Sequence, residues 1–303
     1  MSNRIVSAEV TTTRFDPAQC ELRVVVVPEQ PAADLELRGR LTGPRCLYSE
    51  TVEIAYPLRP LPSEAGLLRA RTVIEEASLW EPQTPFLYEG VLELWQAGVL
   101  IDRTHLAHGV RQLVLGRHGL RLNGQPFVVR GVMRDNCAEV EAFRLRQTGV
   151  NLLLVSVRPD AAELWGLADR FGFFVLGRID PEDDQALWLA ADTLSRHTSC
   201  LGWLLPQGAL AVPQRWHNAM ALLHGQRKEI LIGLAVDDLP LGVLPGHVAF
   251  LACPETLLSE LGKLTIPRIV LSRRTASDLA GRQPSARTIL GWICRDIATE
   301  PDM

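Results

Sequence analysis

The pattern of apolar residues changes near residue 117, and this change constrains the fold more than any other feature of the chain. Before it, short runs of β-forming residues alternate with proline, glycine and aspartate turns, and helical periodicity is scarce. Clear strand-like runs lie at 21–27, 35–41, 50–55 and 90–95. About seven strands within roughly 115 residues are typical of an immunoglobulin-like β-sandwich.

After the change, strand-like and helix-like stretches alternate, which indicates a parallel sheet covered by helices. The candidate strands lie at 129–133, 150–157, 173–176, 201–205, 230–236, 248–253, 268–272 and 288–294. Amphipathic stretches separate most of them, at 138–148, 161–171, 182–196, 214–227 and 255–264. Eight such units predict a compact (β/α)8 TIM barrel with short loops. We therefore expect a multidomain β and α/β protein, with the sandwich at 1–117 and the barrel at 118–303.

A tight hairpin is expected where the two patterns meet. Asn123-Gly124 is the residue pair that a two-residue hairpin turn prefers, and Leu120, Leu122 and Phe127 alternate around it. The next strand would end on Arg134-Asp135, where the active site of a barrel begins.

The amino-acid composition of the chain limits the classes of binding partner that it could have. The net charge of −4 argues against nucleic acid or an anionic membrane as a partner. The N-terminus lacks the apolar core of a signal peptide, and no run approaches the roughly 18 apolar residues of a membrane span. We expect a soluble, cytoplasmic protein.

The six cysteines and seven histidines show no metal-ligand spacing, so neither a metal nor a cofactor is expected. The cysteines are interpreted as reduced thiols, mostly in the core.

Several ordered motifs resemble those of glycoside hydrolase family 2, which includes β-galactosidases, β-glucuronidases and β-mannosidases. The segment Leu79-Trp-Glu-Pro-Gln-Thr-Pro-Phe-Leu-Tyr88 resembles the family's LW-x-P-x-x-P-x-LY, and Gly109-Val-Arg111 resembles its G-F-R. The Asn-Gly hairpin, Asn151, the 164–175 helix and strand, and the stretch 197–203 follow in the family's order. The family's N-terminal jelly roll is expected to be absent, because the sandwich pattern starts almost at residue 1.

This resemblance implies a retaining glycosidase, which needs two carboxylates about 5 Å apart, an acid/base and a nucleophile. Where the family has W-S-L-G-N-E on barrel strand 4, this chain has Trp203-Leu-Leu-Pro-Gln207-Gly208, so glycine stands at the acid/base position and Gln207 at that of the supporting asparagine. On strand 7 the nucleophile position falls on Ser272 or Arg273. Neither side chain can attack an anomeric carbon as a carboxylate does.

Other positions of the family's site are also replaced. The arginine and histidine of strand 2 become Leu154 and Val157, the Asp-Glu pair of strand 3 becomes Gly177-Arg178, and the tryptophan of strand 8 becomes Cys294. With the motif residues of the scaffold present and those of the site replaced, we predict that glycosidase catalysis is lost.

Arginines and aspartates follow the predicted strand ends instead. They are Arg134, Arg158, Arg178, Arg273 and Arg274, with Asp135, Asp160, Asp180, Asp237 and Asp238. One interpretation is a set of salt bridges that closes the mouth. The other is an anion site in which Arg134, Arg158 and Arg178, beside Asp135, converge on a carboxylate or phosphate.

Two classes of function follow. The first is a non-catalytic carbohydrate-binding, anion-binding or scaffold protein, as a monomer or a homodimer. The second is an enzyme, either a glycosidase that hydrolyses O-glycosyl bonds with displaced carboxylates such as Asp180 and Asp237, or an unrelated enzyme built on the arginine rim. Four tryptophans could stack on sugars, but their spacing favours core packing; they are Trp165, Trp188, Trp203 and Trp216.

Overall fold

The chain folds into two compact units, Met1–Gln112 and Leu113–Met303. The computed structural model describes residues 3–16, 18–64, 66–224, 229–241, 243–279, 281–286 and 288–295. The division falls at Gln112 instead of the expected residue 117. The reason is that strand β9 (Leu113–Gly116) pairs with β10 (Gly119–Leu122) and so belongs to the second unit.

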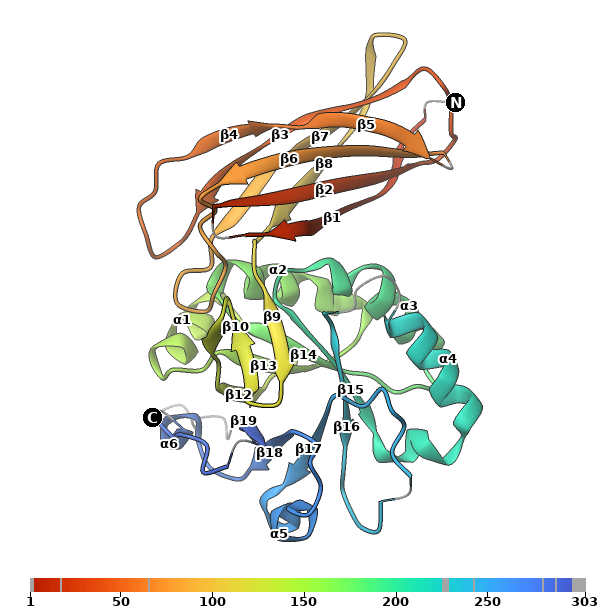
Figure 1. Ribbon diagram of the computed structural model, residues 1–303. Helices are drawn as coiled ribbons and strands as arrows, with labels where there is room; N and C mark the ends of the chain where they lie inside the picture. Colours follow the sequence, from red (N-terminus) through yellow and green to blue (C-terminus); the bar gives the residue numbers. More distant parts are fainter. Residues whose placement is uncertain are drawn as a thin grey trace, which may run out of the picture. The chain divides into compact units, whose positions relative to one another are not determined.

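The first unit is a β-sandwich of two antiparallel four-stranded sheets (Figure 1). One sheet has the order β1-β2-β6-β5, with β1 Ile5–Phe15, β2 Gln19–Pro28, β5 Arg59–Glu64 and β6 Leu67–Glu75. The other has the order β4-β3-β7-β8, with β3 Leu35–Arg45, β4 Ile54–Pro57, β7 Leu87–Gln96 and β8 Val99–His108. The predicted sandwich is confirmed, with eight strands among the described residues.

Alternation along the strands builds the core of this unit. In β2, Leu22, Val24 and Val26 are fully buried, whereas Arg23 and Val25 between them are only half-buried. This period of two is what a sheet with one covered face requires. Trp80 and Tyr88 of the family-like LW…LY segment are also fully buried.

The predicted hairpin is confirmed and leads into the barrel. Asn123 and Gly124 have φ of 50° and 80°, the left-handed pair that a type I′ turn needs, and Leu122 pairs with Gln125 across the turn. The second arm, β11, is only Gln125–Pro126. The chain then leaves the hairpin, and the Phe127 ring packs edge-on against Phe174 at 5.2 Å between centroids.

The second unit contains a closed barrel of parallel strands (Figure 1). Its strands are β12 Val129–Met133, β13 Leu152–Ser156, β14 Phe174–Arg178, β15 Cys200–Pro206, β16 Leu231–Ala235, β17 Phe250–Pro254, β18 Arg268–Ser272 and β19 Ile289–Arg295. The strands pair in sequence order and β19 closes on β12, so the predicted TIM barrel is confirmed. Gly233 leaves room for the Phe250 ring, since a Cβ at Gly233 would lie 2.3 Å from it.

The covering helices are shorter than the amphipathic stretches suggested. They are α1 Glu139–Gln147, α2 Ala162–Phe171, α3 Asp184–Asp192, α4 Pro213–His224, α5 Leu258–Leu261 and α6 Ala276–Leu279. The stretch at 255–264 forms a single 3-10 turn and the four-residue α5. Within the described part of the chain, no helix has the length and apolar character needed to cross a membrane.

Candidate functional site

The position predicted for the family's acid/base residue is a glycine, Gly208. Strand β15 ends at Pro206, and a 3-10 turn over Gln207–Ala211 follows it at the mouth of the barrel, the end where the strands terminate. Gly208 is exposed, and a Cβ built on it would meet no heavy atom within 4 Å. The position therefore has space for a side chain but no group that could transfer a proton.

Gln207 joins two neighbouring loops. Its Oε1 accepts hydrogen bonds from the backbone N–H groups of Asp237 at 3.0 Å and Asp238 at 3.3 Å, and its Nε2 donates to the Asp238 carbonyl at 3.2 Å. Both ends of the amide are thus used by backbone groups. The residue holds the loop after β16 against the end of β15.

The strand 7 position is also unsuited to nucleophilic attack. Ser272 is 3% exposed, and its hydroxyl donates to Glu255 Oε1 at 3.2 Å while accepting from the Arg274 N–H at 3.2 Å. Arg273 is exposed. The carboxylate of Glu255 also lies 3.5 Å from Arg282 Nη1. Sequence reasoning missed Glu255, although its place directly after strand β17 was a usable signal.

The arginines of the predicted anion site point to different partners. Arg134 Nη2 lies 2.8 Å from Glu141 Oε1 on α1, and Arg158 Nε lies 3.4 Å from Asp160 Oδ1. Each of these two arginines thus pairs with a carboxylate on the segment that follows its own strand. The expected convergence of the three arginines is not reflected in these contacts.

Arg178 instead belongs to a small polar group at the ends of β12, β13 and β14. Its Nη2 donates to Ser156 Oγ at 2.9 Å, and the Ser156 N–H donates to Asp135 Oδ1 at 2.7 Å. The side chains of Arg178 and Asp135 are exposed, and that of Ser156 is half-buried. We call these three residues the mouth cluster.

The displaced carboxylates lie in exposed loops at the mouth. Asp180 follows β14, and its Oδ1 accepts from the Glu182 N–H at 3.0 Å. Asp237 follows β16 and is fixed through its backbone by Gln207. Both residues are exposed.

A buried polar group that looks like a catalytic triad lies at the opposite, amino-terminal end of the barrel. Asp169 accepts from His197 Nδ1 at 2.6 Å and from the Ser199 N–H at 2.7 Å, and it is 7% exposed. The Ser199 hydroxyl donates to the Trp165 carbonyl at 3.4 Å, away from the histidine. The group therefore fastens α2 to the start of β15.

Three of the four tryptophans pack in the core as predicted, and one does not. Trp165, Trp203 and Trp216 are at most 2% exposed, and the first two rings lie 5.4 Å apart. The prediction for Trp188 was wrong, because its side chain on α3 is 63% exposed. The spacing of apolar residues in this nine-residue helix did not show which of its faces is buried.

Among the described residues, no group of histidine, cysteine and acidic side chains is arranged to hold a metal ion. The six cysteines are free, and Cys20, Cys200, Cys253 and Cys294 are buried, which confirms that most are core residues. Near the mouth, burial raises the pKa of the Cys137 thiol to about 11.

Comparison with known proteins identifies carbohydrate-active enzymes as the relatives in fold. No protein-family model matches the chain. It is 25% identical over 134 residues to a β-galactosidase of Klebsiella pneumoniae, an alignment that covers 37% of this chain and 13% of that enzyme. Its structure resembles β-glucuronidase 2 of Bacteroides uniformis, with a TM-score of 0.74 at 15% identity over 97% of this chain and 47% of that one.

A second structural relative carries the family's name. A glycosyl hydrolase family 2 member from Bacteroides cellulosilyticus has a TM-score of 0.70 at 15% identity, covering 97% of this chain and 46% of that one. The chain thus spans about half the length of these two structures. The resemblance to glycoside hydrolase family 2 drawn from the sequence motifs is confirmed, and the chain has the sandwich-plus-barrel fold of that family's β-glucuronidases.

Proposed function

We propose that this protein is a non-catalytic relative of the family 2 glycoside hydrolases that binds a carbohydrate or small anion at the mouth of its barrel. The observation that carries the proposal is Gly208, which leaves the acid/base position without a titratable group. A retaining mechanism needs that acid and a facing nucleophile. Ser272, at the nucleophile position, is buried and bonded to Glu255.

The mouth cluster is the proposed binding site. Arg178 uses one guanidinium nitrogen on Ser156 and is exposed, so the rest of its planar donor set is available to a carboxylate or hydroxyl. Asp135 offers an acceptor beside it. A donor and an acceptor in one group suit a sugar that carries an acidic substituent. The sequence similarity to a β-galactosidase and the fold shared with β-glucuronidases support a sugar ligand.

Titration calorimetry would test the binding. We expect glucuronate to bind the full chain and Arg178→Gln to weaken it by about 1.5–3 kcal/mol, because a charged hydrogen bond is lost. Arg158→Gln is the matched control, since Arg158 already pairs with Asp160. Equal weakening by both variants, or no binding by the parent chain, would contradict the proposal.

The alternative is a glycosidase that uses Asp180 and Asp237. It is favoured by one observation, that neither carboxylate makes an ion pair with a described residue, although both lie at the mouth. A panel of aryl β-glycosides separates the two functions. We expect no saturable turnover, and a saturable activity that disappears in Asp180→Asn or Asp237→Asn would establish the alternative.

A further inference from the structure

The strand pairing of the barrel shows which side chains face its interior. Residues paired across parallel strands point to the same side of the sheet, and successive residues alternate between the two sides. Trp203 on β15 lies 5.4 Å from the ring of Trp165 on α2, so it faces the helices. Its neighbour Leu204 therefore faces the interior. Pairing from strand to strand extends this assignment around the barrel and returns consistently to β15.

The last inward residues of seven strands form a ring at the mouth. They are Met133, Ser156, Arg178, Pro206, Ala235, Pro254 and Leu271. Six of them are half-buried and Arg178 is exposed, whereas the inward residues one layer deeper on the same strands are buried. Solvent thus reaches this ring and no deeper layer of these strands. We call its five apolar members, Met133, Pro206, Ala235, Pro254 and Leu271, the apolar floor.

The apolar floor is poorly suited to a sugar ring. Its side chains contain no hydrogen-bond donor, and their only acceptor is the weak thioether of Met133. None of them is an aromatic ring on which a sugar could stack. The hydroxyl groups of a sugar lying on the floor would lose water without gaining partners, which opposes binding. An apolar ring in the same place would lose no hydrogen bonds and would gain from leaving water.

A polar edge borders the floor at the ends of β13 and β14. Arg178 Nη2 donates to Ser156 Oγ at 2.9 Å, and the exposed guanidinium has further donors for a ligand. Asp135 and Asp180 lie in the exposed segments that follow β12 and β14, so a ligand meets charges of both signs at this edge. Charge therefore fixes the head group of a ligand but does not decide which ring binds.

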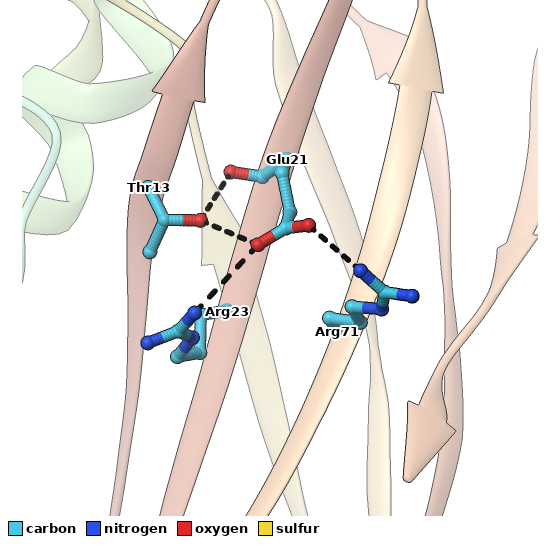
Figure 2. A network of polar contacts seen from close by, with 4 residues as sticks. All are labelled: Thr13, Glu21, Arg23 and Arg71. Carbon is cyan, nitrogen blue, oxygen red and sulfur yellow. Dashed lines mark hydrogen bonds and ion pairs between the residues drawn. The ribbon is translucent and has the colours of Figure 1, made fainter. Parts of the chain in front are cut away.

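The polar residues on the outer face of the sandwich differ from the floor because they contact one another (Figure 2). Glu21 Oε2 accepts from Arg71 Nη1 at 3.2 Å, and Oε1 accepts from Thr13 Oγ1 at 2.9 Å and lies 3.8 Å from Arg23 Nη2. Both carboxylate oxygens of Glu21 thus have partners within the protein. Exposed polar groups can satisfy each other in this way, whereas apolar side chains in contact with water gain only from being covered.

We infer that the barrel mouth binds a small molecule with an apolar ring and one polar head group. The head group contacts Arg178, and the ring lies on the apolar floor. The inference rests on the proposed function for the position of the site, and it selects an organic anion with an apolar body over a carbohydrate as the ligand.

Two matched pairs of ligands test the inference by titration calorimetry on the full chain. Cyclohexanecarboxylate corresponds to glucuronate without its hydroxyl groups and ring oxygen, and cyclohexylmethanol corresponds to glucose in the same way. The members of each pair carry the same charge, so the carboxylates at the mouth affect them equally. We expect the apolar member of each pair to bind about tenfold tighter than the sugar, because only its ring gains from the floor.

Variants of the floor locate the effect. Met133→Gln introduces an amide of similar size, and Leu271→Asn introduces one on the other side of the mouth. Either variant should reduce the preference within each pair to about threefold or less and leave glucuronate binding unchanged. Val114→Thr is the matched control, because Val114 is 47% exposed on β9, outside the barrel, and should alter neither pair. Thermal unfolding confirms that each variant is folded.

Equal or tighter binding of the sugar in either pair would overturn the inference. So would an unchanged preference in both floor variants, or an equal loss in Val114→Thr. Failure of the proposed function is recognised separately. If neither carboxylate binds, or if Arg178→Gln leaves carboxylate binding unchanged, the assignment of the head group is wrong, and the neutral pair still tests the floor. No binding by any of the four ligands would overturn both.

Discussion

The two ends of the barrel use polar residues in opposite ways. At the amino-terminal end, Asp169 and Ser199 are buried and bonded to each other, and Asn151, 7% exposed, bonds the Arg130 N–H and the Val128 carbonyl, each at 2.8 Å. At the mouth, Ser272 is buried and bonded to Glu255, but the mouth cluster is more open. Asp135 and Arg178 face solvent and make single contacts with Ser156.

This difference explains which family-like motifs the chain carries. Asn151 and the stretch 197–203 match the family and lie at the end that holds strands and helices together. Gly208 and Ser272, at the positions predicted for the catalytic residues, differ from the family's motifs and lie at the mouth. A TIM barrel keeps stability and activity at opposite ends of its strands, so one can be lost without the other.

The largest loss of stability is expected from Asp169→Ala at the amino-terminal end of the barrel. The change leaves the buried Ser199 N–H and the His197 ring without their acceptor, which should cost about 3–5 kcal/mol of unfolding free energy. Urea unfolding measures it. Asp180→Ala, an exposed control at the mouth, should change stability by less than about 0.5 kcal/mol. Similar losses of unfolding free energy in the two variants would contradict this difference between the two ends of the barrel.

A second pair of variants compares two amide side chains that both hydrogen-bond backbone groups, one at each end of the barrel. Asn151→Ala should cost about 2–3 kcal/mol, because it unpairs two backbone groups within the barrel wall. Gln207→Ala should cost about 0.5–1 kcal/mol, since water can reach the exposed Asp237 and Asp238 once the amide is gone. Both values follow from urea unfolding, and a Gln207 variant that is the less stable of the two would contradict the assignment.

Much of the fold could be predicted because its signals are local. Short apolar runs predicted β12 at Val129–Met133 and β18 at Arg268–Ser272, and the Asn123-Gly124 pair predicted the turn. The helices were less predictable. The stretch at 255–264 is periodic but yields only α5, because periodicity describes a face and does not fix where backbone hydrogen bonding ends.

The candidate site was less predictable because contacts there depend on side-chain direction. Sequence position placed Arg134 and Arg178 on the same rim, yet Arg134 turns to Glu141 on α1 and Arg178 to Ser156 on the neighbouring strand. Glu255 was missed for the same reason, since its contact with Ser272 joins two strand ends 17 residues apart. Strand order indicates which ends are adjacent but not which partner each side chain selects.

A third prediction concerns Gly208→Glu, which restores a carboxylate at the mouth. The position is open and its backbone is not left-handed, so stability should change by about 0.5 kcal/mol or less. No glycosidase activity should appear, because Ser272 gives no facing nucleophile. Urea unfolding and an aryl β-glycoside assay measure the two results. Saturable turnover in this variant would show that the mouth retains the other parts of an active site.

The smallest expected effect is on the alkylation of two cysteines, one at each end of the barrel. Burial raises the pKa of Cys137 to about 11, and Cys200 at the amino-terminal end is 1% exposed. Only the thiolate reacts with iodoacetamide, so alkylation of Cys137 should rise about tenfold per pH unit from pH 7 to 10, without a plateau below its pKa. Cys200 should remain unmodified while the barrel is folded. Peptide mass spectrometry measures both rates, and a plateau for Cys137 by pH 9 would mean that the mouth is more open to water at this residue than its burial indicates.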